Sequence, residues 1–461
     1  YKRSKLARNR RGDLVLLVNG LPLIHVELKN SGHSYSEAAN QLKRYASEGL
    51  FGGLFRSLQV FVAMTPDEMR YFANPGHPDN FKPEFYFSWR DRENKPVEHW
   101  KAVAAQFLSI PAAHELVANY MIADQGDQTL KVLRSYQIHA IRAILYRLSI
   151  AKDLPTEDWT RRTQLGGYIW HTTGSGKTMT SYKAAELIAR DRLADKVVFV
   201  LDRIDLSNQS FDEYTAFLSD SLGIEQPRSA SQLLAKLRDK KGEPLVVTSL
   251  HKLEQFCSPD TRFISAALHD LQYSRFVFVV DEAHRSTFGN MFANLKRRFP
   301  HSVVIGFTGT PIEEENSRDG VTTSTLFGDE LHRYTVREAI QDGAVLKIMR
   351  EEGLTVSPEE VREMVALEQS KSATREEAYA DPEKLEIYSF YMDSASVPYA
   401  SKSKDEESIE DLAERVWRGS QHRIEVARYI SNYRSRFATP ENYHAILATN
   451  SVKEAIEYYQ L

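Results

Sequence analysis

The sequence predicts an α/β protein with a doubly wound, mostly parallel sheet that follows a smaller α/β unit. Three observations predict this class. Short β-branched runs alternate with helical stretches between residues 167 and 310, which is the pattern of a parallel sheet covered by helices on both faces. A glycine-rich loop separates the first of these runs from a helix. Residues 12–65 have the pattern strand, hairpin, strand, helix, strand, which is typical of a small unit of its own.

Length and composition limit the class further. A chain of 461 residues is too long for one core, and at about 100 to 200 residues per domain we expect two to four domains. Hydrophobic residues make up 42% and charged residues 26%, as is usual for soluble globular proteins. The apolar run FVFVV at 276–280 is far shorter than the roughly 20 residues that cross a bilayer. We therefore expect no membrane partner.

Cysteine content and charge indicate the compartment and the possible partners. The single cysteine, Cys257, excludes an internal disulfide and is typical of the reducing cytoplasm. The net charge of -4 argues against a uniformly basic surface for nucleic acid. Any DNA binding must then come from local basic patches, such as KRSKLARNRR at residues 2–11.

The first part of the chain contains a predicted hairpin and a helix. The strands DLVLLV and LPLIHVELK flank an Asn19-Gly20 turn, and a helix around SEAANQLKRYASE precedes the strand LQVFVAMT. A further helix is expected around HWKAVAAQFL, and IADQGDQTLK at residues 122–131 is expected to be a linker. The helix SYQIHAIRAILYRL follows it.

The central part supplies the strands of the larger sheet. They are predicted at GYIW, KVVFVLD, LVVTSL, RFVFVVDE and SVVIGFTGT, each a short β-branched run of the kind that is buried on both faces. Residues 351–412 are rich in Glu, Ser and Lys, which predicts a helical, charged connection. The segment NYHAILATNSVKEAIEYYQL, residues 442–461, again predicts a strand followed by an amphipathic helix.

The segment HTTGSGKT, residues 171–178, lies between a predicted strand and a predicted helix, the context that a phosphate-binding loop requires. Gly174 and Gly176 allow the backbone of Thr173 to Gly176, including Ser175, to turn N–H groups toward phosphates. Lys177 would reach the β and γ phosphates of ATP, and the Thr178 hydroxyl would hold Mg²⁺. His171 departs from the strict pattern, which has Gly or Ala there. The alternative is a purely structural glycine-rich turn.

Asp281-Glu282-Ala283-His284 follows the strand RFVFVV, at the carboxyl end where ligands bind in such sheets. Asp281 would hold Mg²⁺, and Glu282 would orient and deprotonate the attacking water. His284 is placed to sense the γ phosphate. Downstream of a phosphate loop, these four residues indicate a nucleotide hydrolase.

Together with Gln137 in RSYQIHAI, LDRIDLSNQ at 201–209, TSLHK at 248–252 and GFTGTP at 306–311, these elements resemble a superfamily 2 helicase or translocase motor. The resemblance implies that Gln137 contacts adenine. It also implies that Thr308 and Thr310 couple ATP hydrolysis to the DNA track. The alternative is that Gln137 caps a helix and the threonines only end a strand.

In the strand NGLPLIHVELKN, residues 19–30, side chains alternate between two faces. One face carries Ile24 and Val26, while the other carries His25, Glu27 and Lys29. That charged face is either a solvated surface with an ion pair or part of a nuclease site. Metal-dependent nucleases of the PD-(D/E)xK class hold Mg²⁺ with two carboxylates and use a nearby lysine to offset charge on the phosphate.

Asp13, Glu27 and Lys29 supply this set. Gln41 and Tyr45 on the following helix are four residues apart and share one face, matching the QxxxY element of the RecB-like branch. The alternative for this pair is an ordinary packed amphipathic helix.

The stretches RGDLVLLVNGLPLIHVELKN, LGGYIWHTTGSGKT, VVDEAHRS, GFTGTPI and YTVREAIQDGAVLKI resemble the motor and endonuclease subunit of type I restriction-modification enzymes. The resemblance is strong over residues 12 to 350. It implies an ATP-driven translocase of double-stranded DNA and a Mg²⁺-dependent endonuclease, which acts with methyltransferase and specificity subunits and cuts unmethylated foreign DNA away from the recognition site.

The resemblance also implies the domain order. Residues 1–125 would be the PD-(D/E)xK endonuclease domain and 126–350 the first RecA-like lobe. A helical, charged connection at 351–435 and the beginning of a second, truncated RecA-like lobe at 436–461 would follow. Two competing hypotheses are a stand-alone superfamily 2 helicase or repair translocase with a non-catalytic DNA-binding N-terminal domain, and a nucleotide-gated interaction module without enzymatic activity.

The hairpin provides a geometric test. A two-residue Asn19-Gly20 turn pairs Val18 with Leu21 and would place Asp13 on the wrong face for Glu27. An odd-length loop or a bulge, favoured by Pro22 because it cannot donate to the ladder, would bring Asp13 onto the face of Glu27 and Lys29. We therefore predict an odd register.

Overall fold

The computed structural model describes residues 11–461, apart from 157, 162–164, 202–226, 228, 240, 258–270, 272, 284–287, 315–316, 318–320, 348–355, 401–407, 414–419 and 438–445. The chain divides into two compact units, Tyr1–Lys347 and Ile348–Leu461. The first unit contains both sheets that carry the predicted sites, and the second is helical.

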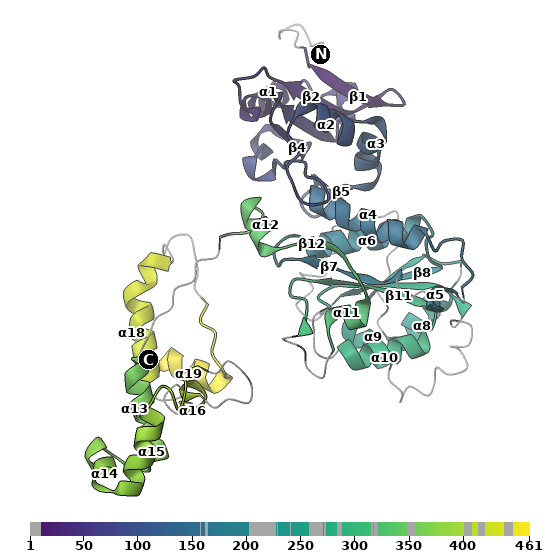
Figure 1. Ribbon diagram of the computed structural model, residues 1–461. Coiled ribbons are helices and arrows are strands. Elements are labelled where there is room, and N and C mark those ends of the chain that lie inside the picture. Colours follow the sequence, from purple (N-terminus) through teal and green to yellow (C-terminus); the bar gives the residue numbers. More distant parts are fainter. Residues whose placement is uncertain are drawn as a thin grey trace. The chain divides into compact units, whose positions relative to one another are not determined.

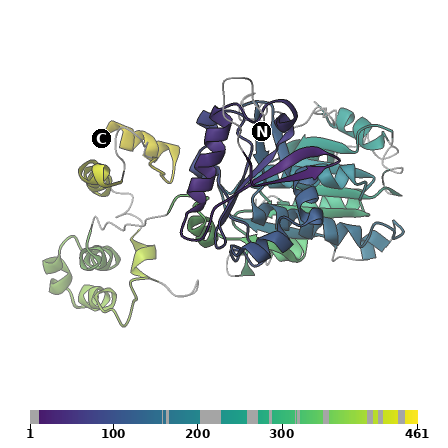
Figure 2. The same ribbon diagram turned by 90° about the horizontal axis from the view of Figure 1, so that it is seen from above.

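The N-terminal sheet has four strands in the order β1-β2-β3-β4 (Figures 1 and 2). They are β1 (Leu14–Val18), β2 (Leu21–Leu28), β3 (Val60–Met64) and β4 (Met69–Ala73). Helix α1 (Tyr35–Ser47) is capped by the Ser34 hydroxyl, which accepts a hydrogen bond from the Ser36 N–H. Its apolar side, including Leu42, packs on Phe61 and Phe72 of the sheet.

The register of the β1–β2 hairpin contains a bulge. Leu16 pairs with Ile24, whereas Leu17 pairs with Pro22, so one residue of β2 is skipped between them. Because Leu14 consequently pairs with Val26, the preceding Asp13 lies at the ladder end opposite Glu27. The predicted odd register is confirmed, and it arises beside the proline that lacks an N–H donor.

Residues expected to be a linker form a second hairpin instead. Strands β5 (Met121–Asp124) and β6 (Thr129–Val132) pair antiparallel, and the Asp124 carboxylate accepts a hydrogen bond from the Gly126 N–H in the turn. The linker prediction for 122–131 is therefore wrong. The polar turn resembles a linker in composition, but Ile122 and Val132 on either side of it are buried in the common core.

The larger sheet has six strands, all parallel, in the order β12-β7-β11-β10-β8-β9 (Figure 1). They are β7 (Gly167–His171), β8 (Lys196–Leu201), β9 (Leu245–Ser249), β10 (Phe276–Val280), β11 (Ser302–Thr308) and β12 (Glu330–Tyr334). Both faces are covered, because Val277 and Val279 of β10 belong to the core under α4 and α6 while Phe276 and Phe278 belong to the core with α9. The predicted doubly wound α/β class is confirmed.

The helices of the first unit complete this layer structure. They are α2 (Trp100–Gln106), α3 (Ile110–Asn119), α4 (Ser135–Ser149), α5 (Asp158–Arg161), α6 (Lys177–Arg190), α8 (Ala230–Arg238), α9 (Leu250–Cys257), α10 (Phe288–Arg298), α11 (Thr323–Phe327) and α12 (Val336–Gln341), with short 3-10 turns η1 (Gly53–Ser57), η2 (Pro78–Asn80) and η3 (Pro83–Phe85).

The second unit contains α13 (Pro358–Gln369), α14 (Arg375–Ala380), α15 (Pro382–Met392), α16 (Ile409–Leu412), α18 (Ser420–Phe437) and α19 (Val452–Gln460). The strand predicted near HAILATNS is wrong for its described part, since residues 446–450 are not a strand and Ile446 is 95% exposed. The described residues of this unit offer it no partner strand, and a lone strand is unstable in water. In the described parts of both units, no helix has the length and apolar character to span a membrane.

Candidate functional site

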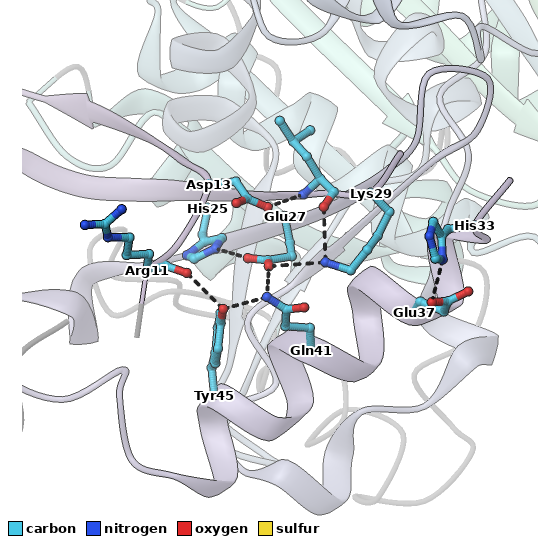
Figure 3. A network of polar contacts seen from close by, with 10 residues as sticks. Arg11, Asp13, His25, Glu27, Lys29, His33, Glu37, Gln41 and Tyr45 are labelled. Atoms are coloured by element: carbon cyan, nitrogen blue, oxygen red, sulfur yellow. Dashed lines mark hydrogen bonds and ion pairs between the residues drawn. The ribbon is translucent and has the colours of Figure 1, made fainter. Parts of the chain in front are cut away.

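Glu27 is the centre of a polar cluster on the inner face of β2 (Figure 3). Its side chain and that of His25 are completely buried. His25 Nε2 lies 3.0 Å from Glu27 Oε2, and Lys29 Nζ lies 3.6 Å from Glu27 Oε1. The side-chain amide of Gln41 also donates to Glu27 Oε1. Three nitrogen-bearing side chains thus surround one carboxylate.

Helix α1 supplies the other side of this cluster. Gln41 Nε2 lies 2.6 Å from the hydroxyl of Tyr45, which is one helical turn further on. The Tyr45 hydroxyl donates to the carbonyl oxygen of Arg11 at 2.9 Å. The chain before β1 is thereby tied to the helix that faces Glu27.

Asp13 occupies the exposed end of the same hairpin (Figure 3). Its Oδ2 accepts a hydrogen bond of 2.8 Å from the Leu28 N–H, the residue after Glu27. The structure therefore brings Glu27 and Lys29 together with the helix pair, and it holds Asp13 against the strand that carries them.

The burial of Glu27 excludes the solvated-face interpretation. A carboxylate buried without partners would cost several kcal/mol, and here His25, Lys29 and Gln41 provide the compensation. No group of three or more His, Cys, Asp or Glu side chains arranged to hold a metal ion occurs in the part of the chain that the structure describes. A cation at this site would have two protein carboxylates, Asp13 and Glu27, which fits Mg²⁺ because it keeps several waters or phosphate oxygens as ligands.

The phosphate loop connects β7 to α6, as predicted from the sequence. Gly174 and Gly176 have φ of 82° and 77°, in the left-handed region that favours glycine. The Ser175 hydroxyl donates to the Thr172 carbonyl at 2.6 Å and closes the loop. Lys177 is the first residue of α6, so the loop delivers its N–H groups to a helix N-terminus.

The side chains at the carboxyl ends of β7 and β10 meet. Thr178 Oγ1 donates to Asp281 Oδ2 at 2.7 Å, and Lys177 Nζ lies 3.5 Å from Glu282 Oε1. Burial raises the pKa of Asp281 above its ordinary value. Because the two oxygen groups predicted to hold Mg²⁺ are already within hydrogen-bonding distance of each other, this pair fits that cation.

The loop after β11 approaches the phosphate loop closely at Gly309. A Cβ atom there would lie 2.9 Å from Thr173 Oγ1 and 3.2 Å from Lys177 Nζ, so a larger residue would displace these neighbours. Trp170 Nε1 donates to the Gly309 carbonyl at 3.2 Å. Sequence reasoning singled out GFTGTP but missed Trp170, which joins it to β7.

Gln137 caps a helix, as the alternative interpretation of this residue predicted. Its Oε1 accepts a hydrogen bond of 2.8 Å from the Arg134 N–H and caps α4, while its Nε2 lies 3.1 Å from Thr180 Oγ1. The same residue lines a cavity of about 640 Å³ beside the phosphate loop, with Gly174 and Met179 among the other lining residues. Its contact with adenine stays a prediction. His284 and most of LDRIDLSNQ lie outside the described residues.

Comparisons with known proteins find matches to both parts of the chain that contain these candidate sites. Residues 2–80 match the family described as type I restriction enzyme R protein N terminus, and residues 136–381 match the SWI2/SNF2 ATPase family. An endonuclease subunit of a type I restriction enzyme from Staphylococcus aureus is 31% identical over 98% of this chain and 42% of its own length. A Mycoplasma pneumoniae protein, provisionally named as the C-terminal part of such a subunit, is 34% identical over 44% of this chain and 95% of its own length.

The chain belongs to the SWI2/SNF2 ATPase family and to the type I restriction enzyme endonuclease subunits. The chain spans 42% of the length of the S. aureus relative. Among solved structures, the SWI2/SNF2 ATPase core of Sulfolobus solfataricus in complex with dsDNA aligns with a TM-score of 0.31 and 14% identity, over 69% of this chain and 72% of that chain.

His25 is a site residue of this restriction-subunit chain whose role sequence reasoning missed. The alternation along β2 already placed it on the face of Glu27, which was the available signal. Its hydrogen bond to Glu27 and its edge-on contacts with Phe51 and Phe61, at 5.9 and 6.2 Å between ring centroids, are visible only in the fold.

Removing the Tyr45 hydroxyl tests the helix side of the Glu27 cluster. In the assembled enzyme, we expect Tyr45→Phe to slow DNA cleavage about tenfold, because the hydroxyl's hydrogen bonds with Gln41 and with the Arg11 carbonyl, each worth about 1 kcal/mol, are both lost. ATP hydrolysis should be unchanged. The matched control is Tyr35→Phe on the same helix, whose ring lies under the Arg70 guanidinium. Equal cleavage by both variants would contradict a role for Tyr45 in cutting.

Proposed function

We propose that this chain is the nuclease and first motor part of a type I restriction enzyme endonuclease subunit, which translocates double-stranded DNA at the expense of ATP and cuts it in a Mg²⁺-dependent reaction. Its partners are methyltransferase and specificity subunits, and its substrate is unmethylated foreign DNA that is cut away from the recognition site. The observation that carries the proposal is that one compact unit contains both the Glu27 cluster and the phosphate loop with its Asp281–Glu282 pair.

At the nuclease site, Asp13 and Glu27 are the residues that would hold Mg²⁺. The cation, when bound, supplies charge stabilisation and a more acidic water at the scissile phosphate. Lys29 orients the water and offsets negative charge on the phosphate, since it lies 3.6 Å from the Glu27 carboxylate. Gln41 and Tyr45 fix the position of Glu27 from the helix side.

At the motor site, Thr178 and Asp281 would hold Mg²⁺ with ATP. The loop N–H groups and Lys177 bind and neutralise the phosphates, and Glu282 orients the attacking water. Glu282 has a φ of 53°, and such unfavourable backbone conformations concentrate at active sites. The adenine base would enter the cavity of about 640 Å³ beside Gln137.

The alternative is a stand-alone superfamily 2 helicase whose N-terminal unit only binds DNA. The complete burial of Glu27 favours the nuclease, because a surface that only binds DNA has no use for a buried carboxylate surrounded by His25 and Lys29. Carboxylates repel phosphates unless a cation lies between them.

The substitution Glu27→Gln tests the nuclease part of this proposal. It preserves the size of the side chain but removes its charge, so cleavage of unmethylated circular DNA by the complete enzyme should fall at least about 100-fold. Translocation should persist, as measured by displacement of a DNA triplex. Full cleavage activity in this variant, with Mg²⁺ and ATP present, would favour the helicase alternative.

A further inference from the structure

Two stacked tyrosines lie behind the phosphate loop. Tyr136 is the second residue of α4 and Tyr334 is the last residue of β12. Their ring centroids are 3.6 Å apart and their planes differ by 6°, and both side chains are buried. The ring of His171, which replaces the usual small residue at the start of the loop, meets both of them edge-on. The stack therefore has one defined position.

Tyr136 contacts the loop backbone directly. Its hydroxyl donates to the carbonyl oxygen of Ser175 at 2.6 Å. In a trans peptide the C=O and the following N–H point in opposite directions. Holding the Ser175 carbonyl toward α4 therefore turns the Gly176 N–H away from α4, to the side on which the loop would receive phosphate. Since glycine permits a wide range of backbone angles, this peptide needs an external restraint.

The far end of the stack is anchored as well. The Tyr334 hydroxyl donates to Asp342 Oδ2 at 3.0 Å, and Asp342 forms an ion pair with Arg90. Burial raises the pKa of Tyr136 above its ordinary value, so its hydroxyl keeps the proton that it donates. Three side chains, those of Asp342, Tyr334 and Tyr136, thus connect Arg90 to the Ser175 carbonyl of the phosphate loop.

We propose that Tyr136 is a positioning residue for ATP binding, which sets the orientation of the Ser175–Gly176 peptide while the Tyr334–Asp342–Arg90 chain holds it in place. The inference rests on the proposed function of the loop. It gives α4 a role in orienting the phosphate loop, in addition to its capping by Gln137. It also explains why a histidine occupies position 171, since the His171 ring packs against both tyrosines.

The test is Tyr136→Phe in the full-length subunit assembled with its partners. The ring and its stack remain, so the fold is kept. The apparent KM for ATP in DNA-stimulated hydrolysis should rise about 3- to 10-fold, the effect of one net hydrogen bond. At saturating ATP, kcat should stay within about twofold, because the lost interaction serves ground state and transition state alike.

The matched control is Tyr182→Phe on α6, since the Tyr182 hydroxyl is buried without a hydrogen-bond partner among the described residues. It should leave the KM unchanged. Tyr334→Phe, which releases Asp342 but keeps the stack, should give a smaller rise than Tyr136→Phe.

The two proposals can fail separately. An unchanged KM in Tyr136→Phe, with normal ATP binding by the wild type, would overturn the inference alone, and so would a lower kcat at constant KM. Failure of the wild-type enzyme to bind Mg²⁺-ATP would overturn the proposed function and the inference with it.

Discussion

Lys177→Ala should abolish ATP hydrolysis, translocation and, in consequence, DNA cleavage. The Lys177 side chain, at the end of the phosphate loop, is 5% exposed. Its Nζ lies 3.5 Å from the Glu282 carboxylate. Without it, charge on the transferred phosphoryl group loses a stabilising cation at the place where charge develops. We expect at least a 100- to 1000-fold fall in turnover, on the order of other preorganised electrostatic contacts. Cutting should disappear because it follows translocation in the proposed function.

The measurement is phosphate release by the complete enzyme with unmethylated cognate DNA, together with a cleavage assay on the same samples. The control is Lys183→Ala on the same helix, whose Nζ pairs with Glu186 at 3.0 Å. It removes a lysine of similar burial from α6 without touching the loop, so hydrolysis should remain near wild type. ATPase activity retained by Lys177→Ala would refute the motor assignment.

Lys29→Ala should abolish DNA cleavage but leave ATP hydrolysis and translocation intact. The Lys29 ammonium is 3.6 Å from the Glu27 carboxylate and also donates to the Leu28 carbonyl at 3.1 Å. In the proposed function, only strand scission uses this charge. DNA cleavage should fall about 100- to 1000-fold, whereas ATP hydrolysis and translocation should continue at wild-type rates.

The control for this variant is Lys43→Ala, an exposed lysine on α1, which should cut normally. Circular unmethylated DNA is converted to the linear form by a cutting enzyme, so gel mobility measures cleavage and phosphate release measures the motor in one reaction. Linear product at the wild-type rate from Lys29→Ala would mean that the Glu27 cluster does not cut DNA. Loss of both activities would mean that the substitution disturbs the fold.

Much of the architecture follows from local chemistry. β-Branched runs such as FVFVV need burial on both faces, and the structure buries all five of its residues. Gly174 and Gly176 adopt backbone angles that favour glycine. The position of the loop could therefore be predicted from the spacing of these glycines in the sequence. The alternation of His25, Glu27 and Lys29, and the helical spacing of Gln41 and Tyr45, likewise follow from the periods of a strand and a helix.

Other features depended on contacts between distant residues. The polar turn between β5 and β6 has the composition of a linker, and only the burial of Ile122 and Val132 in the core makes it a hairpin. Residues 446–450 have the composition of a strand, yet the described residues of their unit provide no neighbouring strand with which they could pair. A strand exists only where a partner is in register.

The sequence by itself determined which residues are candidates for the chemistry, because glycines in a turn, carboxylates at strand ends and alternation along a strand are local properties. Tertiary structure decided how those residues meet. The bulge between the Leu16–Ile24 and Leu17–Pro22 pairs brings Asp13 opposite Glu27. The ring stack joins Tyr136 to Tyr334, which lie far apart in the sequence. Such pairings depend on packing between segments far apart in the chain, and no local pattern specifies that packing.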